Sequence, residues 1–77
     1  MDKNTDFPQY RKLSNGRTFY KIIDDRNFLE IQLMGSKKVL HEIKATQYPE
    51  MLRIKDMLDL VEPFELAKKN EFEDLID

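Results

Sequence analysis

An Asn-Gly dipeptide at positions 15 and 16 constrains the fold of this chain more than any other feature. It separates two segments typical of strands, residues 10–14 and 17–23. Asparagine and glycine best tolerate the positive φ angles that both central residues of a type I′ hairpin turn require. The sequence therefore predicts a β-hairpin with a two-residue loop. The expected pairs are Leu13 with Thr18 and Arg11 with Tyr20.

Two further turns extend this hairpin into a longer antiparallel arrangement. A two- or four-residue loop within Asp24–Asn27 pairs Tyr20 with Ile31, and a three-residue loop at Gly35–Lys37 pairs Ile31 with His41. These registers agree with one another, and they predict three strong strands plus a weaker first strand. A two-residue Gly-Ser loop at the last turn would break the agreement.

The predicted registers divide the side chains between two faces of the sheet, because alternate residues of a strand point to opposite sides. The face expected to be buried carries Leu13, Thr18, Tyr20, Ile22, Leu29, Ile31, Leu33, Val39, His41, Ile43 and Ala45. The opposite face carries Tyr10, Lys12, Phe19, Lys21, Ile23, Phe28, Glu30, Gln32, Met34, Leu40, Glu42 and Lys44. The second face is mixed, but it is richer in large apolar groups than a solvated face.

The last third of the chain is predicted to be helical. Tyr48-Pro49 favours a helix start, since proline is tolerated in the first turn, and the helix is expected over residues 49–61. The apolar residues at helical spacing are Met51, Ile54, Leu58 and Val61. Pro63 ends this helix, and short helical segments follow over residues 63–76, with Asn70 resembling an N-cap.

Together these elements predict one α+β domain over residues 9–77, after a frayed tail at residues 1–8. The domain is an antiparallel three- to four-stranded β-meander, at about residues 10–45, packed on one face by a C-terminal α-helix, with one or two short helical segments after it.

Composition limits how so small a domain can be supported. The 77 residues include no cysteine and one histidine, which excludes disulfides, thiolate metal sites and histidine-rich metal sites. Oligomerisation is the support that remains open. The sequence shows no secretory signal and no apolar stretch long enough to cross a bilayer, so we expect a cytoplasmic protein without membrane contact.

Charge is unevenly distributed along the chain, although the net charge is only −2. Basic residues outnumber acidic ones from residue 9 to 48, and acidic residues dominate from residue 49 to 77. The two halves are expected to attract each other within one fold, to attract a second copy, or to attract an anionic partner.

Nothing in the sequence favours catalysis or a cofactor. His41 is expected to be a neutral imidazole facing the core. Asp24-Asp25 is better explained by turn chemistry than by metal binding, and both glycines belong to hairpins rather than to a phosphate-binding loop. We therefore predict a protein that is not an enzyme, with no cofactor and no metal. No motif identifies a family, and the size and composition are those of a small bacterial protein.

Two binding roles are left for the mixed face of the sheet. The candidate binding surface consists of Tyr10, Lys12, Phe19, Lys21, Ile23, Phe28, Leu40 and Lys44. The favoured interpretation is a protein-interaction module, with the chain itself as the expected partner, because apolar residues on both faces need a second layer. The alternative is a nucleic-acid-binding module, because aromatic and basic side chains on a sheet can stack bases and contact phosphates. Glu30, Glu42 and the negative net charge argue against that alternative.

Overall fold

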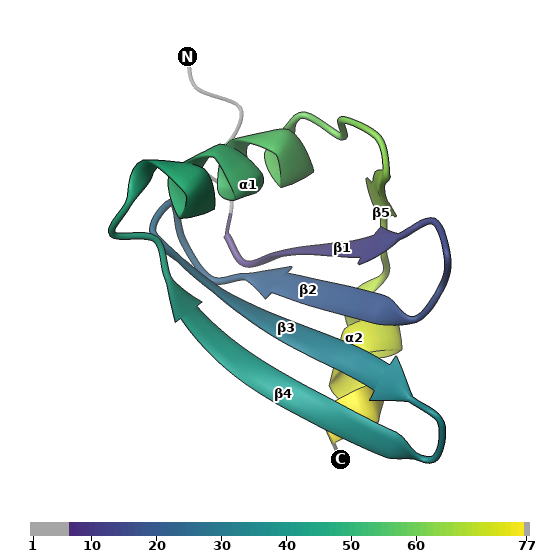
Figure 1. Ribbon diagram of the computed structural model, residues 1–77. Helices are drawn as coiled ribbons and strands as arrows, with labels where there is room; N and C mark the ends of the chain where they lie inside the picture. Colours follow the sequence, from purple (N-terminus) through teal and green to yellow (C-terminus); the bar gives the residue numbers. More distant parts are fainter. Residues whose placement is uncertain (1–6, 77) are drawn as a thin grey trace.

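The computed structural model describes residues 7–76, in which a five-stranded antiparallel sheet lies between two helices (Figure 1). The strands are β1 (Gln9–Leu13), β2 (Thr18–Ile22), β3 (Asn27–Met34), β4 (Lys37–Lys44) and β5 (Phe64–Leu66). The helices are α1 (Tyr48–Leu58) and α2 (Lys69–Ile76). The strand order is β4-β3-β2-β1-β5. The predicted α+β class with an antiparallel sheet is confirmed.

The register of β1 and β2 is confirmed, although the turn between them differs from the prediction. Arg11 pairs with Tyr20 as expected. Gly16 has a φ of 71°, whereas Asn15 does not have the positive φ that a type I′ turn requires. The Gly16 N–H donates to the Leu13 carbonyl at 2.9 Å, and the Asn15 side chain accepts the Arg17 N–H at 2.8 Å. Only one of the two central residues, Gly16, therefore has the positive φ that glycine tolerates best.

The predicted register of β3 is wrong by one residue. A three-residue loop connects β2 to β3, with the Ile23 N–H donating to the Asn27 carbonyl at 2.9 Å. The Asp24 carboxylate holds this loop by accepting hydrogen bonds from the Arg26 N–H at 2.8 Å and the Asn27 side chain at 2.9 Å. Tyr20 consequently faces Glu30 rather than Ile31. Because alternate residues change face, the whole of β3 is inverted relative to the prediction.

The register between β3 and β4 is also displaced by one residue, which returns β4 to its predicted orientation. Met34 pairs with Lys37 across a two-residue Gly35-Ser36 loop, and Gly35 has a φ of 63°. His41 therefore lies opposite Glu30. The two displacements cancel, so β3 alone carries its side chains on unexpected faces.

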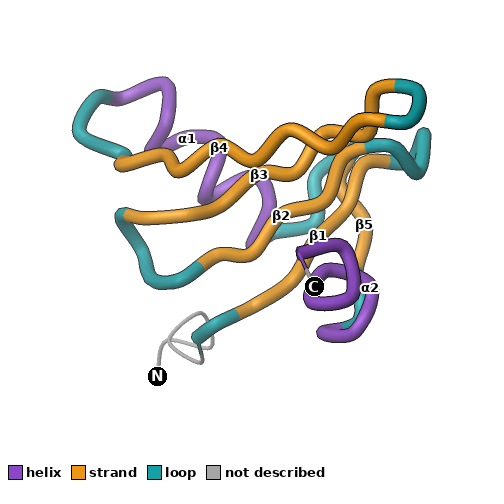
Figure 2. Tube along the Cα trace, turned by 90° about the horizontal axis from the view of Figure 1, so that it is seen from below, coloured by secondary structure: helices purple, strands orange, loops and turns teal. Residues whose placement is uncertain are grey.

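Helices α1 and α2 lie on opposite faces of the sheet (Figures 1 and 2), and the observed facing of β3 places its apolar residues in two small cores, one beneath each helix. The α1 core consists of Tyr20, Ile22, Phe28, Ala45, Ile54 and Met57. The α2 core consists of Tyr10, Ile31 and Phe72, with Phe19, Leu29, Leu33, Ala67 and Leu75 packed against it. Leu29, Ile31 and Leu33 were predicted to lie with the α1 core, and Phe28 on the opposite face. Both predictions are wrong, because the three-residue turn held by Asp24 shifts the register of β3 by one residue.

Helix α1 begins at Tyr48 with proline in its first turn, as predicted, but it ends three residues before the predicted residue 61. Its last carbonyls are satisfied by a Schellman motif, in which the Val61 N–H donates to Asp56 at 2.9 Å and the Leu60 N–H to Met57 at 3.3 Å. Leu60 occupies the left-handed position of this motif with a φ of 57°. Glycine is the usual residue at such a position.

Arg11 anchors the end of α1 to the sheet. Its side chain is only 6% exposed. Nε donates to the Met57 carbonyl at 2.7 Å, Nη1 to the Tyr10 carbonyl at 2.8 Å and Nη2 to the Gln9 side chain at 2.7 Å. Burial lowers the pKa of this guanidinium, and the negative end of the α1 dipole favours the cation there.

Of the one or two short helical segments predicted over residues 63–76, the structure has one, α2, and the residues directly after Pro63 form a strand instead. Phe64–Leu66 forms the edge strand β5, which pairs with β1 so that Phe64 lies opposite Leu13. The Phe64 ring packs edge-on against the Tyr20 ring, with 5.7 Å between the ring centroids. The strand is favoured over a helix because it forms hydrogen bonds with backbone groups of β1 that would otherwise lack partners. Helix α2 then begins at Lys69 rather than after Asn70, and the Glu71 carboxylate accepts the Lys68 N–H at 2.9 Å.

The predicted tail at residues 1–8 falls mainly on residues 1–6, which lie outside the described residues, as does Asp77. Phe7, by contrast, packs against the α1 core. Within residues 7–76, neither helix has the length and apolar character that crossing a bilayer requires.

Leu60→Gly should stabilise the protein, because glycine removes the cost of a left-handed leucine, which is about 0.5–1 kcal/mol after the entropy of the unfolded glycine is subtracted. Urea unfolding measures the change. Leu52→Gly is the matched control, since Leu52 is 39% exposed against 41% for Leu60 but lies within α1. The control should be destabilised by about 1 kcal/mol, and a destabilised Leu60→Gly would contradict this account.

Candidate functional site

Helix α2 covers the basic side chains of β1 and β2 with its own acidic residues. Lys12 Nζ lies 3.0 Å from a Glu71 carboxylate oxygen, and Lys21 Nζ lies 3.1 Å from one of Glu73. The Tyr10 hydroxyl donates to the same Glu73 oxygen at 3.0 Å. The opposite charges of the two halves of the chain therefore meet within the fold, which is one of the three outcomes that the sequence left open.

These contacts shift the pKa values of the groups concerned. The hydrogen bond from Lys21, followed by that from Tyr10, lowers the pKa of Glu73 below its ordinary value. The backbone N–H of Lys68, followed by Lys12, lowers the pKa of Glu71. Burial is the main cause that raises the pKa of Tyr10. The two lowered pKa values keep Glu71 and Glu73 ionised at neutral pH, and the raised pKa of Tyr10 keeps its phenol neutral, so that it can donate to Glu73.

A polar cluster on the other face of the sheet is best explained by folding. Arg53 Nη2 donates to Glu30 at 3.0 Å and to the Tyr20 hydroxyl at 3.2 Å, and the guanidinium lies over the Phe28 ring at 5.3 Å from its centroid. Burial, followed by the hydrogen bond with Glu30, raises the pKa of Tyr20 to about 12. The cluster thus gives the buried Glu30 carboxylate a cation and keeps the phenol neutral.

A shallow groove opens on the α2 face where the C-terminal end of α2 passes β3 and β4. Its volume is about 290 Å3. The lining residues are Ile31, Lys38, Leu40, Leu75 and Ile76. Leu40 is 54% exposed and Ile76 45% exposed, although Ile31 at the base is buried. The groove is therefore an apolar surface in contact with solvent, and one side of it is the edge of the sheet.

Lys38 closes one side of this groove. Its Nζ donates to the Leu75 carbonyl, at the C-terminal end of α2, at 2.6 Å. A cation at this position satisfies an end carbonyl and interacts favourably with the helix dipole. The contact fixes the end of α2 relative to β4, so that Leu75, Ile76 and Leu40 share one surface.

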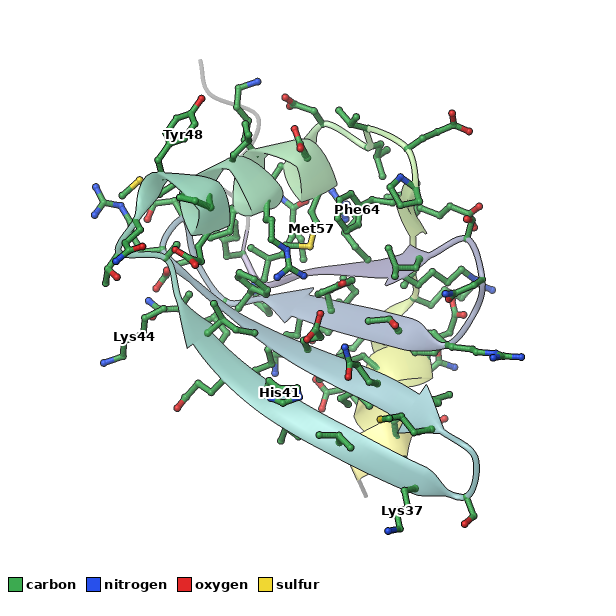
Figure 3. All side chains as sticks on the ribbon, in the orientation of Figure 1. Lys37, His41, Lys44, Tyr48, Met57 and Phe64 are labelled. Carbon is green, nitrogen blue, oxygen red and sulfur yellow. The ribbon has the colours of Figure 1, made fainter. Side chains whose placement is uncertain are left out.

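Strand β4 lies at the edge of the sheet and presents backbone hydrogen-bonding groups to solvent. The Ala45 N–H donates to the Arg26 carbonyl in the direction of β3. Because alternate residues of a strand direct their N–H and C=O groups to the same side, Val39, His41 and Ile43 also point to β3. The groups of Lys38, Leu40 and Glu42 point outward. Lys37 and Lys44 extend away from the two ends of the strand (Figure 3).

His41 is exposed, which corrects the prediction of a core-facing imidazole. It lies on the same face as the α1 core, as predicted. The α1 core, however, takes in only the C-terminal end of β4, where Ile43 packs against it, and leaves His41 exposed (Figure 3). Within residues 7–76, the structure contains no group of three or more acidic or histidine side chains placed to hold a metal ion.

The predicted binding surface is divided by the structure into separate environments. Tyr10 is buried beneath α2, Lys12 and Lys21 are paired with it, and Phe19 packs against the α2 core. Phe28 is fully buried on the opposite face. Ile23 and Lys44 are exposed, and of the predicted set only Leu40 lines the groove.

The sequence-based prediction missed Ile31, Lys38, Leu75 and Ile76 as lining residues. The available signal was the Gly35-Ser36 dipeptide, because a two-residue loop there places Ile31 opposite Leu40. The contribution of α2 had no comparable signal, since it depends on where an eight-residue helix docks.

Comparisons with protein families, with curated proteins and with solved structures gave no match to this chain. A function can therefore be inferred only from the groove and the edge of the sheet beside it.

Glu73→Gln should weaken the docking of α2 at pH 7, because it removes the carboxylate that Lys21 and Tyr10 contact. The lowered pKa of Glu73 means that its stabilising effect is complete above the ordinary value of 4.5 and is lost as the pH falls through the lowered value. The difference in urea midpoint between wild type and variant should therefore stay constant from pH 7 to about 4.5 and narrow as the pH falls further, through the lowered pKa of Glu73.

Asp74→Asn, at an exposed position of the same helix, is the control and should change the midpoint little. A wild-type advantage over Glu73→Gln that stays unchanged as the pH falls well below 4.5 would show that the carboxylate charge does not hold the helix.

Proposed function

We propose that this chain is a small, non-catalytic protein-interaction module that self-associates through the edge of its sheet. The proposed contact region consists of Ile31, Lys38, Leu40, Glu42, Leu75 and Ile76. The observation that supports the proposal is the position of an exposed apolar groove directly beside an edge strand.

The apolar groove and the edge strand together support self-association more strongly than either does alone. An edge strand offers backbone hydrogen bonds to any extended chain, and small proteins usually block such edges with charges. In β4 the lysines stand toward the ends, at positions 37, 38 and 44, while Leu40 is exposed near the middle. This pattern disfavours indiscriminate strand addition and leaves an apolar centre for a partner whose charges match.

The nucleic-acid alternative receives less support. Lys12 and Lys21, which were expected to contact phosphates, are occupied by Glu71 and Glu73. Tyr10 and Phe28 are buried, so neither ring is available for stacking on a base.

Self-association should be visible by sedimentation velocity over a range of protein concentrations. We expect wild type to shift toward a larger species as the concentration rises, and Leu40→Lys to remain monomeric because a charge replaces the exposed apolar centre. Met34→Lys is the matched control, since Met34 is 60% exposed at the end of β3 and should still associate. Circular dichroism confirms that the variants are folded.

A folded wild type that stays monomeric at the highest concentration would contradict the proposal. So would binding of single-stranded oligonucleotides that weakens steeply with salt and is equally strong in Leu40→Lys, because that result favours the nucleic-acid alternative.

A further inference from the structure

We infer that two copies of this chain pair through β4 in one defined register, antiparallel and centred on Leu40, so that their two sheets become continuous. The inference rests on the proposed self-association and adds the register and the residue pairs that determine it.

The backbone directions limit the possible pairings. Lys38, Leu40 and Glu42 direct their N–H and C=O groups away from β3, as follows from the hydrogen bond between Ala45 and Arg26. A second strand must therefore form its hydrogen bonds with these residues. The same three side chains lie on the face that carries α2, since Lys38 and Leu40 line the groove.

Symmetry limits the pairings further. Two identical antiparallel edge strands are related by a two-fold axis perpendicular to the sheet, so each face of one sheet continues into the same face of the other. A residue can then oppose only a residue that points to the same face. The axis must therefore lie midway between the two copies of one residue, which face each other across it. The central positions of β4 allow three registers, centred on Val39, Leu40 or His41.

Charge distinguishes these three registers. Centring on Leu40 places Lys38 opposite the partner's Glu42, and the symmetry repeats this ion pair. Centring on His41 places Lys38 opposite the partner's Lys44, and like charges directly opposite each other are destabilising. Centring on Val39 places Lys38 opposite the partner's Leu40, without an ion pair. Only the Leu40 register combines a central apolar contact with two flanking pairs of opposite charge.

The same register extends the groove. The two Leu40 side chains meet at the axis on the α2 face, beside Ile31, Leu75 and Ile76 of each copy. Lys38, which already contacts the end carbonyl of α2, gains a carboxylate from the partner's Glu42. On the opposite face, Val39 meets the partner's His41. The exposed apolar area around Leu40 is thus covered without burying an unpaired charge.

Single cysteines test this register directly, because the chain has no cysteine of its own. In the Leu40 register, the Cα atoms of the two residues 40 lie about 5.5 Å apart, a distance suited to a disulfide. Residues 39 and residues 41 are then offset diagonally by about 7–8 Å or more, beyond easy reach. Under mild oxidation, Leu40→Cys should cross-link roughly tenfold faster or more than Val39→Cys and His41→Cys.

A charge exchange provides a second measurement that leaves Leu40 in place. Lys38→Glu and Glu42→Lys should each raise the dissociation constant of the dimer roughly tenfold, and the double variant should recover most of the loss, because the pair is restored in reversed order. Sedimentation gives the dissociation constants.

The outcomes separate the register from the proposed function. A dimer that cross-links fastest at position 39 or 41, or a double variant no better than the single variants, would overturn the Leu40 register and leave self-association standing. A protein that is monomeric throughout would overturn both.

Discussion

The three-residue turn held by the Asp24 carboxylate determines how the rest of the molecule is covered. It determines which side chains of β3 point to each face of the sheet. Phe28 lies in the core beneath α1, and Ile31 lies in the core on the other face. A sheet with large apolar residues on both faces needs a cover on each. Two helices provide it, and Arg11 ties the end of one of them to β1 by hydrogen bonds to backbone carbonyls.

The short second helix explains why a surface remains open. Helix α2 has eight residues, and its ion pairs with Lys12 and Lys21 hold it over β1 and β2. It reaches β4 only at its end, through the contact between Lys38 and Leu75. The apolar residues beyond that point form the groove, and the edge of the sheet runs beside it. The proposed interaction surface follows from the length and charge of α2 rather than from a separate binding element.

The sequence predicted the elements with strong local signals and failed where two arrangements were equally apolar. The β1–β2 register followed from Asn15-Gly16, and the inner side of α1 followed in part from the spacing of Met51, Ile54 and Leu58. Met57 is buried in addition, whereas Val61 is exposed beyond the end of the helix. In β3, Phe28 competes with Leu29 and Ile31 for the core, so alternation alone could not choose a face, and the deciding hydrogen bonds come from Asp24. The strand β5, with three residues, is too short for a periodic signal. Of the residues that line the groove, the sequence pointed only to Leu40, because the positions of the others depend on the register of β3 and on where α2 docks.

Amide hydrogen exchange along β4 measures the pairing of this edge most directly. At high protein concentration, we expect the amides of Lys38, Leu40 and Glu42 to be protected like those of Val39, His41 and Ile43, which face β3. On dilution, protection of the first three should fall while that of the others stays. If the Leu40 amide exchanges at the rate of an open chain at every concentration, while the His41 amide stays protected, β4 remains a free edge and the central claim fails.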